Sequence, residues 1–546
     1  MRLRAAACFA LFIGIAGAAV PLPGPGPAGV RFEGVTPIPA SVDAALRPYL
    51  EFRSHELWSW HASRREVLVG RVVAGVRQVH QVSEPGKPPR PLTISDGGAN
   101  KAWASAGKDD FVFVTGDSPR ARLFFYDAAA SRVTPISPEG AAAQGWAWSP
   151  KGDRFAYTTR SADGAGGRRT ELHLANPARP NSGKPLASWR FGAWTSFAFS
   201  PDGRRLVGIE RRGDDSAVWI IEVRSGKQRR ITRRGMEPIR YGSPAFTRDG
   251  RGILARSDRD FEFPRLVHID AATGKERVLA GSAGRGVEAF ALSSDAALAA
   301  FITNESGASV LRFYDLQAWK ELPRPPLLHG VIGGLQWRPR SRELGFHIAS
   351  ARSAGDVFSY ELDSNGLTRW TNGNSPGVNT RELAEPRMIR WNSFDGLGIS
   401  GLHYHPPERF TGKRPVVVAI SSGAGLQARP GFIGPMNHLV GDLGIAVIYP
   451  NVRGSSGFGK SFRELGKGDP QDAVKDIGAL LDWIAAQPDL DASKVVLADL
   501  GGASVAAATA RAYADRVAGS VSASTQPEVA NVLAATIEYA RRVLPP

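Results

Sequence analysis

Short apolar stretches in the middle of the chain alternate with turns made of Pro, Asp and Gly, a pattern that predicts β-hairpins. One such phrase recurs every 43 to 51 residues between about residue 60 and residue 350. Its clearest copies are "AWSPKGDRFAY" from Ala147, "AFSPDGRRLVG" from Ala198, "AFTRDGRGILA" from Ala245, "ALSSDAALAAF" from Ala291 and "LQWRPRSRELGF" from Leu335, and fainter copies begin at His61 and Trp103. The middle of the chain is therefore an internal repeat.

Each repeat also contains a second hairpin with glycine at its turn, as in Val218–Thr232 and Leu266–Ala280. Four short antiparallel strands in about 45 residues are typical of one blade of a β-propeller. We expect a seven-bladed β-propeller over residues 51–375. An extended array of β-sandwiches is the alternative, but the repeat length favours blades.

The pattern changes after residue 375. Arg414–Ser421 and Gly444–Gly454 are continuous apolar runs, as expected for strands buried on both faces of a parallel sheet. Between these strands and the next one, Asp469 and Pro470 form a helix start, and apolar residues follow at helical spacing. We expect an α/β domain with a mostly parallel sheet over residues 376–546.

The N-terminus has the order of a secretory signal peptide: basic residues, a short apolar core and the small residues Ala16–Ala19. We expect cleavage of residues 1–19, a Pro- and Gly-rich linker over residues 20–50, and a secreted or periplasmic protein without a stable membrane span. An uncleaved anchor is the alternative. The single cysteine, Cys8, would leave with the signal peptide, so the mature chain would contain no disulfide and no cysteine nucleophile.

Composition narrows the range of partners. The formal net charge is +16, but the basic residues are spread along the chain without a stripe of interleaved aromatic residues. We therefore expect no nucleic-acid partner. The sequence shows no phosphate-binding loop, dinucleotide fingerprint or metal-ligand cluster, so we expect neither a cofactor nor a metal ion.

The α/β segment carries a more specific signal. Its "NVRGSSGFGKSF" (Asn451–Phe462), followed by the helix and strand of Asp472–Val495, resembles the prolyl oligopeptidase family of serine peptidases, in particular its bacterial dipeptidyl or acylaminoacyl peptidase branch. The resemblance implies an α/β-hydrolase domain that cleaves short peptides through a Ser, Asp and His triad. It also implies a propeller that restricts the entry of substrates.

The nucleophile position of that family departs from the pattern in this chain. The family places G-G-S-Y-G-G after the strand that corresponds to "KVVLA". An alignment without gaps puts Asp499 and Leu500 on the first two glycines, Gly501 on the nucleophile and Gly502 on the next residue. Ser504, three residues after Gly501, is the alternative nucleophile, although a serine in a first helical turn commonly bonds to the backbone.

The oxyanion loop departs from the family pattern as well. Family members carry H-G-G-P-G after the first central strand, and this chain has "SSGAG" there. The histidine position is Ser421 and the proline position is Ala424. By resemblance, the positions that would form the oxyanion hole are Ser421, Ser422, Gly423 and Gly502.

A triad also needs an acid and a histidine after the nucleophile. The last histidine is His438, and the acids after Gly501 are Asp515, Glu528 and Glu538. We therefore expect a C-terminally truncated α/β-hydrolase domain. His403, His405 and His438 precede the turn, and we expect them to be packing or surface residues.

Together these departures predict a secreted peptidase homologue without catalytic activity. Three alternatives stay open. The chain could be an active serine peptidase or esterase that uses Ser504 on short peptides, or a propeller-based module that binds a peptide or a protein. It could also be the product of a decaying gene that barely folds, because a truncated sheet leaves an unpaired edge.

Overall fold

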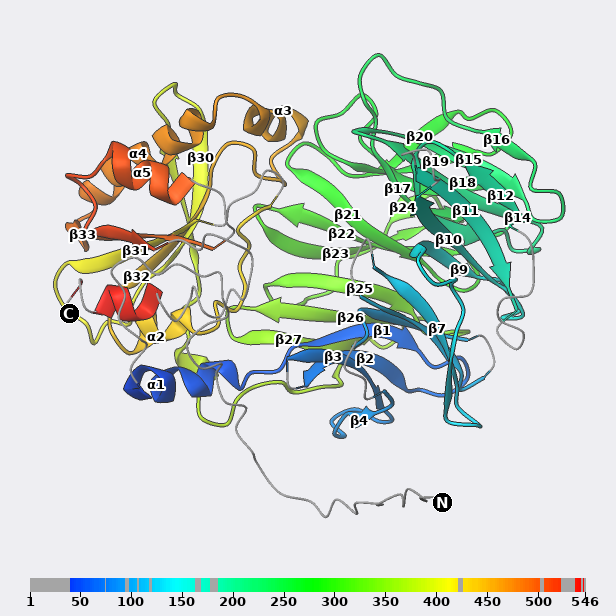
Figure 1. Ribbon diagram of the computed structural model, residues 1–546, viewed down its shortest axis with the longest axis horizontal. Coiled ribbons are helices and arrows are strands. Elements are labelled where there is room, and N and C mark those ends of the chain that lie inside the picture. The colour runs from blue at the N-terminus through cyan, green and yellow to red at the C-terminus, as the bar shows by residue number, and fades with distance from the viewer. Residues whose placement is uncertain are drawn as a thin grey trace, which may run out of the picture.

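The structure is a computed structural model with two parts, a β-propeller and an α/β domain (Figure 1). It describes residues 40–73, 75–93, 98–105, 108–116, 120–162, 168–176, 185–420, 426–500, 505–521, 536–541 and 544. Within these ranges, no helix has the length and the apolar character needed to cross a membrane.

Seven four-stranded antiparallel sheets form the propeller, so the predicted seven-bladed ring is confirmed. Blades 1 to 4 are β1 (His55–Trp60), β2 (Val67–Val73), β3 (Val76–Val82) and β4 (Arg90–Pro91); β5 (Lys101–Ala104), β6 (Phe111–Thr115), β7 (Arg122–Asp127) and β8 (Arg132–Pro135); β9 (Ala142–Trp148), β10 (Phe155–Ala162), β11 (Arg168–Ala175) and β12 (Ala187–Trp189); β13 (Ala193–Phe199), β14 (Arg205–Arg212), β15 (Asp215–Glu222) and β16 (Gln228–Arg230). Blades 5 to 7 are β17 (Tyr241–Phe246), β18 (Gly252–Ser257), β19 (Arg265–Asp270) and β20 (Glu276–Ala280); β21 (Arg285–Leu292), β22 (Leu298–Glu305), β23 (Ala308–Asp315) and β24 (Lys320–Glu321); β25 (Val331–Trp337), β26 (Glu343–Ser350), β27 (Ser353–Glu361) and β28 (Gly366–Arg369).

The repeated Ser/Thr and Asp of the sequence phrase bond to each other in the turn between the first two strands of a blade. In blade 4 the hydroxyl of Ser200 donates to Asp202 (2.5 Å) and accepts from the backbone N–H of Arg205 (2.9 Å). Blade 6 repeats this with Ser293 and Asp295 (2.5 Å). Because the hydroxyl serves both strands at once, the phrase fixes the length of the turn.

The ring closes without a shared strand, because blades 1 and 7 are each built from one continuous piece of chain. Side chains join them instead. The indole N–H of Trp60 donates to the carbonyl of Gln336 (2.9 Å), and the side-chain amide of Gln336 donates to the carbonyl of Trp58 (2.5 Å). Arg65 forms an ion pair with the buried Glu343 (2.6 Å).

The α/β domain contains a six-stranded sheet in the order β29-β30-β32-β31-β33-β34. Its elements are β29 (Arg387–Asn392), β30 (Gly398–Tyr404), β31 (Arg414–Ile420), α2 (Met436–Gly441), β32 (Ala446–Asn451), α3 (Lys460–Glu464), α4 (Pro470–Ala485), β33 (Leu490–Asp499), α5 (Val505–Ala512) and β34 (Gly519–Val521), with short 3₁₀ turns η1 (Thr380–Glu382) and η2 (Leu465–Lys467). β32, β31, β33 and β34 are parallel; β30 pairs antiparallel with β32, and β29 pairs antiparallel with β30 at the edge of the sheet.

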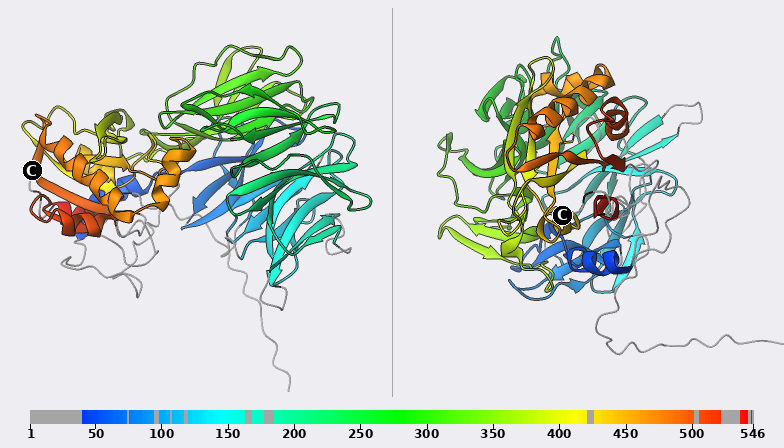
Figure 2. Two further views of the ribbon diagram at one scale, coloured as in Figure 1. Left: turned by 90° about the horizontal axis from the view of Figure 1, so that it is seen from above. Right: turned by 90° about the vertical axis from the view of Figure 1, so that its left-hand side faces the viewer.

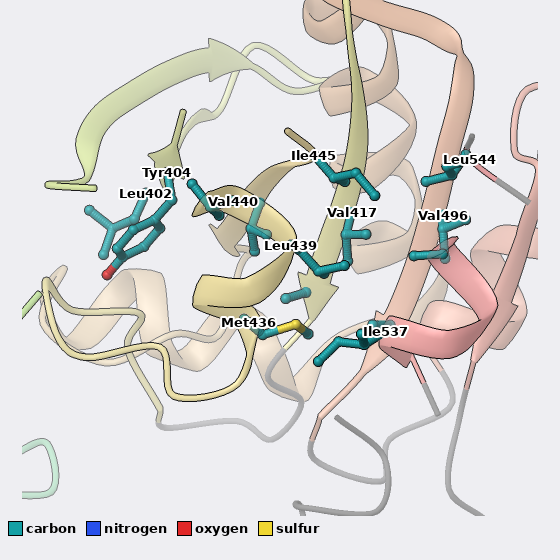
Figure 3. Packing of buried hydrophobic residues seen from close by; sticks show 14 of the residues in the cluster. Leu402, Tyr404, Val417, Met436, Leu439, Val440, Ile445, Val496, Ile537 and Leu544 are labelled. Atoms are coloured by element: carbon teal, nitrogen blue, oxygen red, sulfur yellow. The ribbon is translucent and has the colours of Figure 1, made fainter. Parts of the chain in front are cut away.

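Helices cover both faces of this sheet, as the alternating pattern predicts. The carboxylate of Asp469 accepts from the backbone N–H of Gln471 (2.9 Å) and so begins α4 at the predicted cap. α4 and α5 pack on one face. α2 and the helical residues 536–541 pack on the other, where Met436 and Ile537 contribute to one apolar cluster (Figure 3).

The segment expected to be a linker contains a helix, α1 (Ala40–Leu50), which lies beneath the α/β domain in Figure 1. Leu46 is buried in the same cluster as residues of α2 and β31, and the Tyr49 hydroxyl donates to Asp442 (2.8 Å). Residues 40–50 therefore belong to the α/β domain rather than to a free linker. Pro48 near the helix end obscures this helix in the sequence pattern.

Candidate active site at the carboxyl edge of the sheet

The two segments expected to carry the catalytic machinery follow neighbouring strands. β31 and β33 are parallel, and Ile420 pairs with Asp499 at their carboxyl ends. The backbone N–H of Leu500 donates to the carbonyl of Ile420 (2.9 Å). β31 and β33 thus end side by side at the carboxyl edge of the sheet, which is where open α/β sheets place their ligand-binding sites.

The predicted site residues themselves lie just past this point. Gly501, Gly502 and Ser504 fall in residues 501–504, and Ser421, Ser422 and Gly423 fall in residues 421–425; both ranges are outside the described residues. Their roles therefore stay predictions. The described elements on either side are the strand β33 before residue 501 and the helix α5 after residue 504, as the sequence predicts.

A buried asparagine fixes the segment that follows the first of these loops. Asn451, at the end of β32, is 1% exposed. Its side-chain carbonyl accepts from the backbone N–H of Ala428 (2.6 Å), and its amide donates to the carbonyl of Ala428 (3.4 Å). The chain after residue 425 is therefore attached to the carboxyl edge of the sheet.

The same segment also attaches the propeller. Arg429 forms an ion pair with Glu288 of β21 (2.9 Å) and donates to the carbonyl of Gly307 (2.7 Å). The side-chain amide of Asn304 in blade 6 donates to Gln427 (2.6 Å). The chain next to the expected oxyanion loop is thus held between the sheet and blade 6.

A second network fixes the family-like "NVRG" segment after β32. The guanidinium of Arg453 contacts Asp476 of α4 (2.8 Å) and Asp395 (3.1 Å), and the Ser393 hydroxyl donates to Asp476 (2.6 Å). Asp476 is 0% exposed and Arg453 is 7% exposed, so both partners of this ion pair are buried. The hydrogen bonds that Arg453 donates to Asp476 and Asp395 raise the pKa of Arg453 above its usual range.

Charged residues join α3 and η2 to blades 4 and 5. Lys467 donates to Asp214 (2.7 Å), and this contact, together with one from Arg240, lowers the pKa of Asp214 to about 2. The Ser461 hydroxyl donates to Glu262 (2.7 Å) and lowers the pKa of that carboxyl. The α/β domain therefore contacts the mouth of the propeller at blades 4 to 6 through these side chains, and at blade 7 through the buried Ala351 and the ion pair of Arg352 with Glu385 (3.2 Å).

All ten histidines of the sequence lie in the described residues. His403 pairs with Ile448 near the start of β32, and His405 lies 3.6 Å from Asp489, which precedes β33. Both therefore lie at the edge of the sheet opposite to the turn after β33. Burial, followed by the nearby His405, lowers the pKa of His403 to about 4.

His438 of α2 is also engaged away from the turn. Its Nδ1 lies 2.7 Å from Asp442, the carboxylate that accepts from Tyr49. The expectation that these three histidines are packing or surface residues agrees with their contacts. Within the described part of the chain, no group of three or more His, Cys, Asp or Glu residues could hold a metal ion.

Sequence reasoning missed the residues that hold this edge together. Asn451 and Arg453 lie inside the motif that carries the family resemblance, but their partners Ala428 and Asp476 are distant in sequence. Arg429 follows the expected oxyanion loop without any local pattern that predicts contact with a propeller blade. In the sequence, only the family-like motif that contains Asn451 and Arg453 could have indicated that these two residues matter.

The comparisons with known proteins agree with this geometry. Residues 435–516 match the family model described as the prolyl oligopeptidase family. No curated protein sequence matches the chain.

Solved structures resemble it along most of its length. They include a puromycin-hydrolyzing peptidase from Mycobacterium tuberculosis (17% identity, TM-score 0.74, 88% of this chain and 78% of that one) and a puromycin hydrolase (19%, 0.72, 89% and 79%). A third is prolyl oligopeptidase B from Galerina marginata (12%, 0.70, 84% and 70%). These identities show a shared fold. Within the α/β domain, residues 435–516 are thus similar to the prolyl oligopeptidase family, and the two-part fold is shared with these structures.

Proposed function

We propose that this protein is a secreted homologue of prolyl oligopeptidase-family peptidases that binds peptides but does not cleave them by nucleophilic catalysis. The proposal is carried by the sequence after β33, in which the gapless alignment with the family pattern puts Gly501 on the nucleophile. Glycine has no hydroxyl group and cannot form an acyl-enzyme. Asp499, where the family has glycine, also departs from the small-residue pattern of the turn.

The surroundings of the turn support the same proposal. A serine nucleophile needs a histidine within hydrogen-bond reach to take its proton. His403 and His405 lie at the opposite edge of the sheet, and His438 is bonded to Asp442. Ser421 also replaces the first residue of the family's oxyanion loop.

The complete propeller is the part of the chain that supports a peptide-binding role. The propeller ring is complete, and its mouth is attached to the α/β domain through blades 4 to 7. The proteins of similar fold include a peptidase and an oligopeptidase, so short peptides are the ligands to test first. The proposed secretion rests on residues 1–19, which lie outside the described residues.

A fluorophosphonate probe tests the loss of chemistry, because it labels serine nucleophiles that are activated by a base. We expect no labelling of the purified protein. The opposite result, stoichiometric labelling that disappears in Ser504→Ala, would establish the alternative of an active serine peptidase or esterase. Ser522→Ala removes a serine from the same part of the chain and serves as the control.

A further inference from the structure

The propeller mouth that faces the α/β domain carries an equivalent position in blades 3 to 6. In each of these blades the backbone N–H of the first turn residue donates to the carbonyl of the residue that follows the turn. The pairs are Ser149 and Arg154, Ser200 and Arg205, Thr247 and Gly252, and Ser293 and Leu298. Six residues further along the second strand, the four blades present Arg160, Arg211, Asp258 and Asn304. These four side chains therefore occupy the same level of the mouth.

Blades 5 and 6 use this position to attach the α/β domain. The carboxylate of Asp258 lies 3.6 Å from the ammonium of Lys460. The amide of Asn304 donates to Gln427. The same level of blades 3 and 4 is differently occupied, because it carries two arginines instead of an acid and an amide.

Among the described residues, these two arginines have no anionic partner. The Nε of Arg160 is buried without a hydrogen-bond partner, and neither Arg160 nor Arg211 forms an ion pair with any residue that the structure describes. Arg212 next to them is different, since it is bound to Glu210 at 2.6 Å. Glu210 also accepts from the indole N–H of Trp219 (2.9 Å), so both of its carboxylate oxygens have partners.

Arg160 and Arg211 line one pocket of about 540 Å³. Phe191, which is 76% exposed, forms part of the same wall. Gly213 closes the pocket on the side of Asp214, the residue that binds Lys467 of the α/β domain. The pocket thus begins where the domain contact ends, and blade 3 lies away from the α/β domain in the left view of Figure 2.

We propose that this pocket binds the carboxylate of a short peptide, with an adjacent apolar side chain of that peptide packed on Phe191. Guanidinium groups bind carboxylates through paired N–H donors, and two of them without acidic partners in the described chain favour an anion. A pocket of this size accommodates a few side chains and not a folded domain. The inference rests on the proposed function for the peptide nature of the ligand, and it adds where the ligand binds and what chemistry it carries.

Anisotropy of dansyl-labelled peptides tests this on the full protein, because the dansyl group adds no carboxylate. Dansyl-Gly-Gly-Phe with a free C-terminus is compared with its C-terminal amide and with dansyl-Gly-Glu-Phe-amide. We expect the amide without an acid to bind at least about tenfold more weakly than the free acid. Tight binding of the Glu peptide amide would assign the site to acidic side chains as well as to chain ends.

Arg160→Gln combined with Arg211→Gln should weaken binding of the free acid by about tenfold or more. Arg204→Gln with Arg248→Gln is the matched control, since it removes the same charge from exposed turns on the opposite mouth and should change binding less than about twofold. Equal binding of acid and amide, or binding that ignores Arg160 and Arg211, would overturn this inference alone. If the wild-type protein binds none of the peptides, the proposed peptide-binding role fails with it.

Discussion

The propeller and the α/β domain distribute their stabilising contacts in opposite ways. In the propeller the same small turn recurs from blade to blade, and each copy is held by a local hydroxyl such as that of Ser200 or Ser293. In the α/β domain one buried network around Arg453 and Asp476 joins a loop, a helix and an edge strand. We therefore expect the loss of one repeated turn to have a small effect, and the loss of a residue from the single buried network to destabilise a whole domain.

The largest expected effect follows from removal of the cation in that network. Arg453→Met leaves the carboxylate of Asp476 buried without its charged partner, and we expect a loss of about 3–5 kcal/mol in the free energy of unfolding of the α/β domain. Calorimetry resolves this loss if the α/β transition moves to lower temperature while the propeller transition does not. Arg342→Met, which breaks an exposed pair with Asp363, should cost less than about 1 kcal/mol. Equal losses in the two variants would contradict the proposed contrast.

Acid should weaken the α/β domain through His403. Its pKa is lowered from 6.5 to about 4 because burial, followed by His405, disfavours the charged form. A lowered folded-state pKa means that the unfolded chain takes up the proton first. Stability is therefore complete above about pH 6.5 and falls as the pH decreases towards 4, by up to about 3 kcal/mol.

The measurement is thermal unfolding of wild type and His403→Asn between pH 7.5 and 4. The variant should lose less stability over this range than the wild type. His347→Asn is its counterpart in blade 7, where burial also lowers the pKa of the histidine to about 4. This variant should reduce the pH dependence of the unfolding temperature of the propeller instead. An unchanged pH profile in both variants would show that neither histidine controls acid stability.

The repeated turns should each contribute little. Ser200→Ala removes one hydroxyl that bonds on both sides of a turn, and we expect a loss of about 1 kcal/mol in the free energy of unfolding of the propeller. Ser293→Ala should cost a similar amount, and the double variant should show the sum because the two turns lie in different blades. Urea unfolding checks both values. A loss above about 3 kcal/mol from either single change would mean that the blades are not independent.

We expect the smallest effect from an attempt to restore catalytic activity. Gly501→Ser with Asp499→Gly and Ala503→Gly rebuilds G-x-S-x-G, yet we expect no hydrolysis of an activated aminoacyl ester above the rate in buffer. A serine without a base stays protonated and weakly nucleophilic, a deficit on the order of 10⁴ to 10⁶ in rate. Turnover in this variant would mean that a base has been missed. Adding His438→Ala to it would then test the histidine nearest the turn in sequence.

The sequence predicts the parts of the fold that local patterns specify. The Ser/Thr and Asp of each turn bond within a few residues, so a single chain segment contains the whole signal for a blade. Asp469 and Pro470 likewise start α4 without help from distant residues. Helix α1 escaped detection because it is stabilised by contacts far away in the chain, for example between Tyr49 and Asp442.

The candidate site divides in the same way. The strand before Gly501 and the helix after it can be predicted from local propensity. The clamp of Asn451 on Ala428 and the contact of Arg429 with Glu288 join segments that only the folded chain brings together. The pair of arginines in the pocket at the propeller mouth could not be found from sequence either, because their isolation depends on which acids the fold places near them.

Helix α1 also has a consequence for synthesis. The chain enters the propeller just after α1 and leaves it at the same place, where the backbone N–H of Arg53 donates to the carbonyl of Gly373 (2.7 Å). The propeller is therefore an insertion within the α/β domain. On the ribosome, α1 emerges first, and the strands that bury Leu46 emerge only after all seven blades. The apolar cluster that contains Leu46 can therefore be completed only after the last blade has been synthesised.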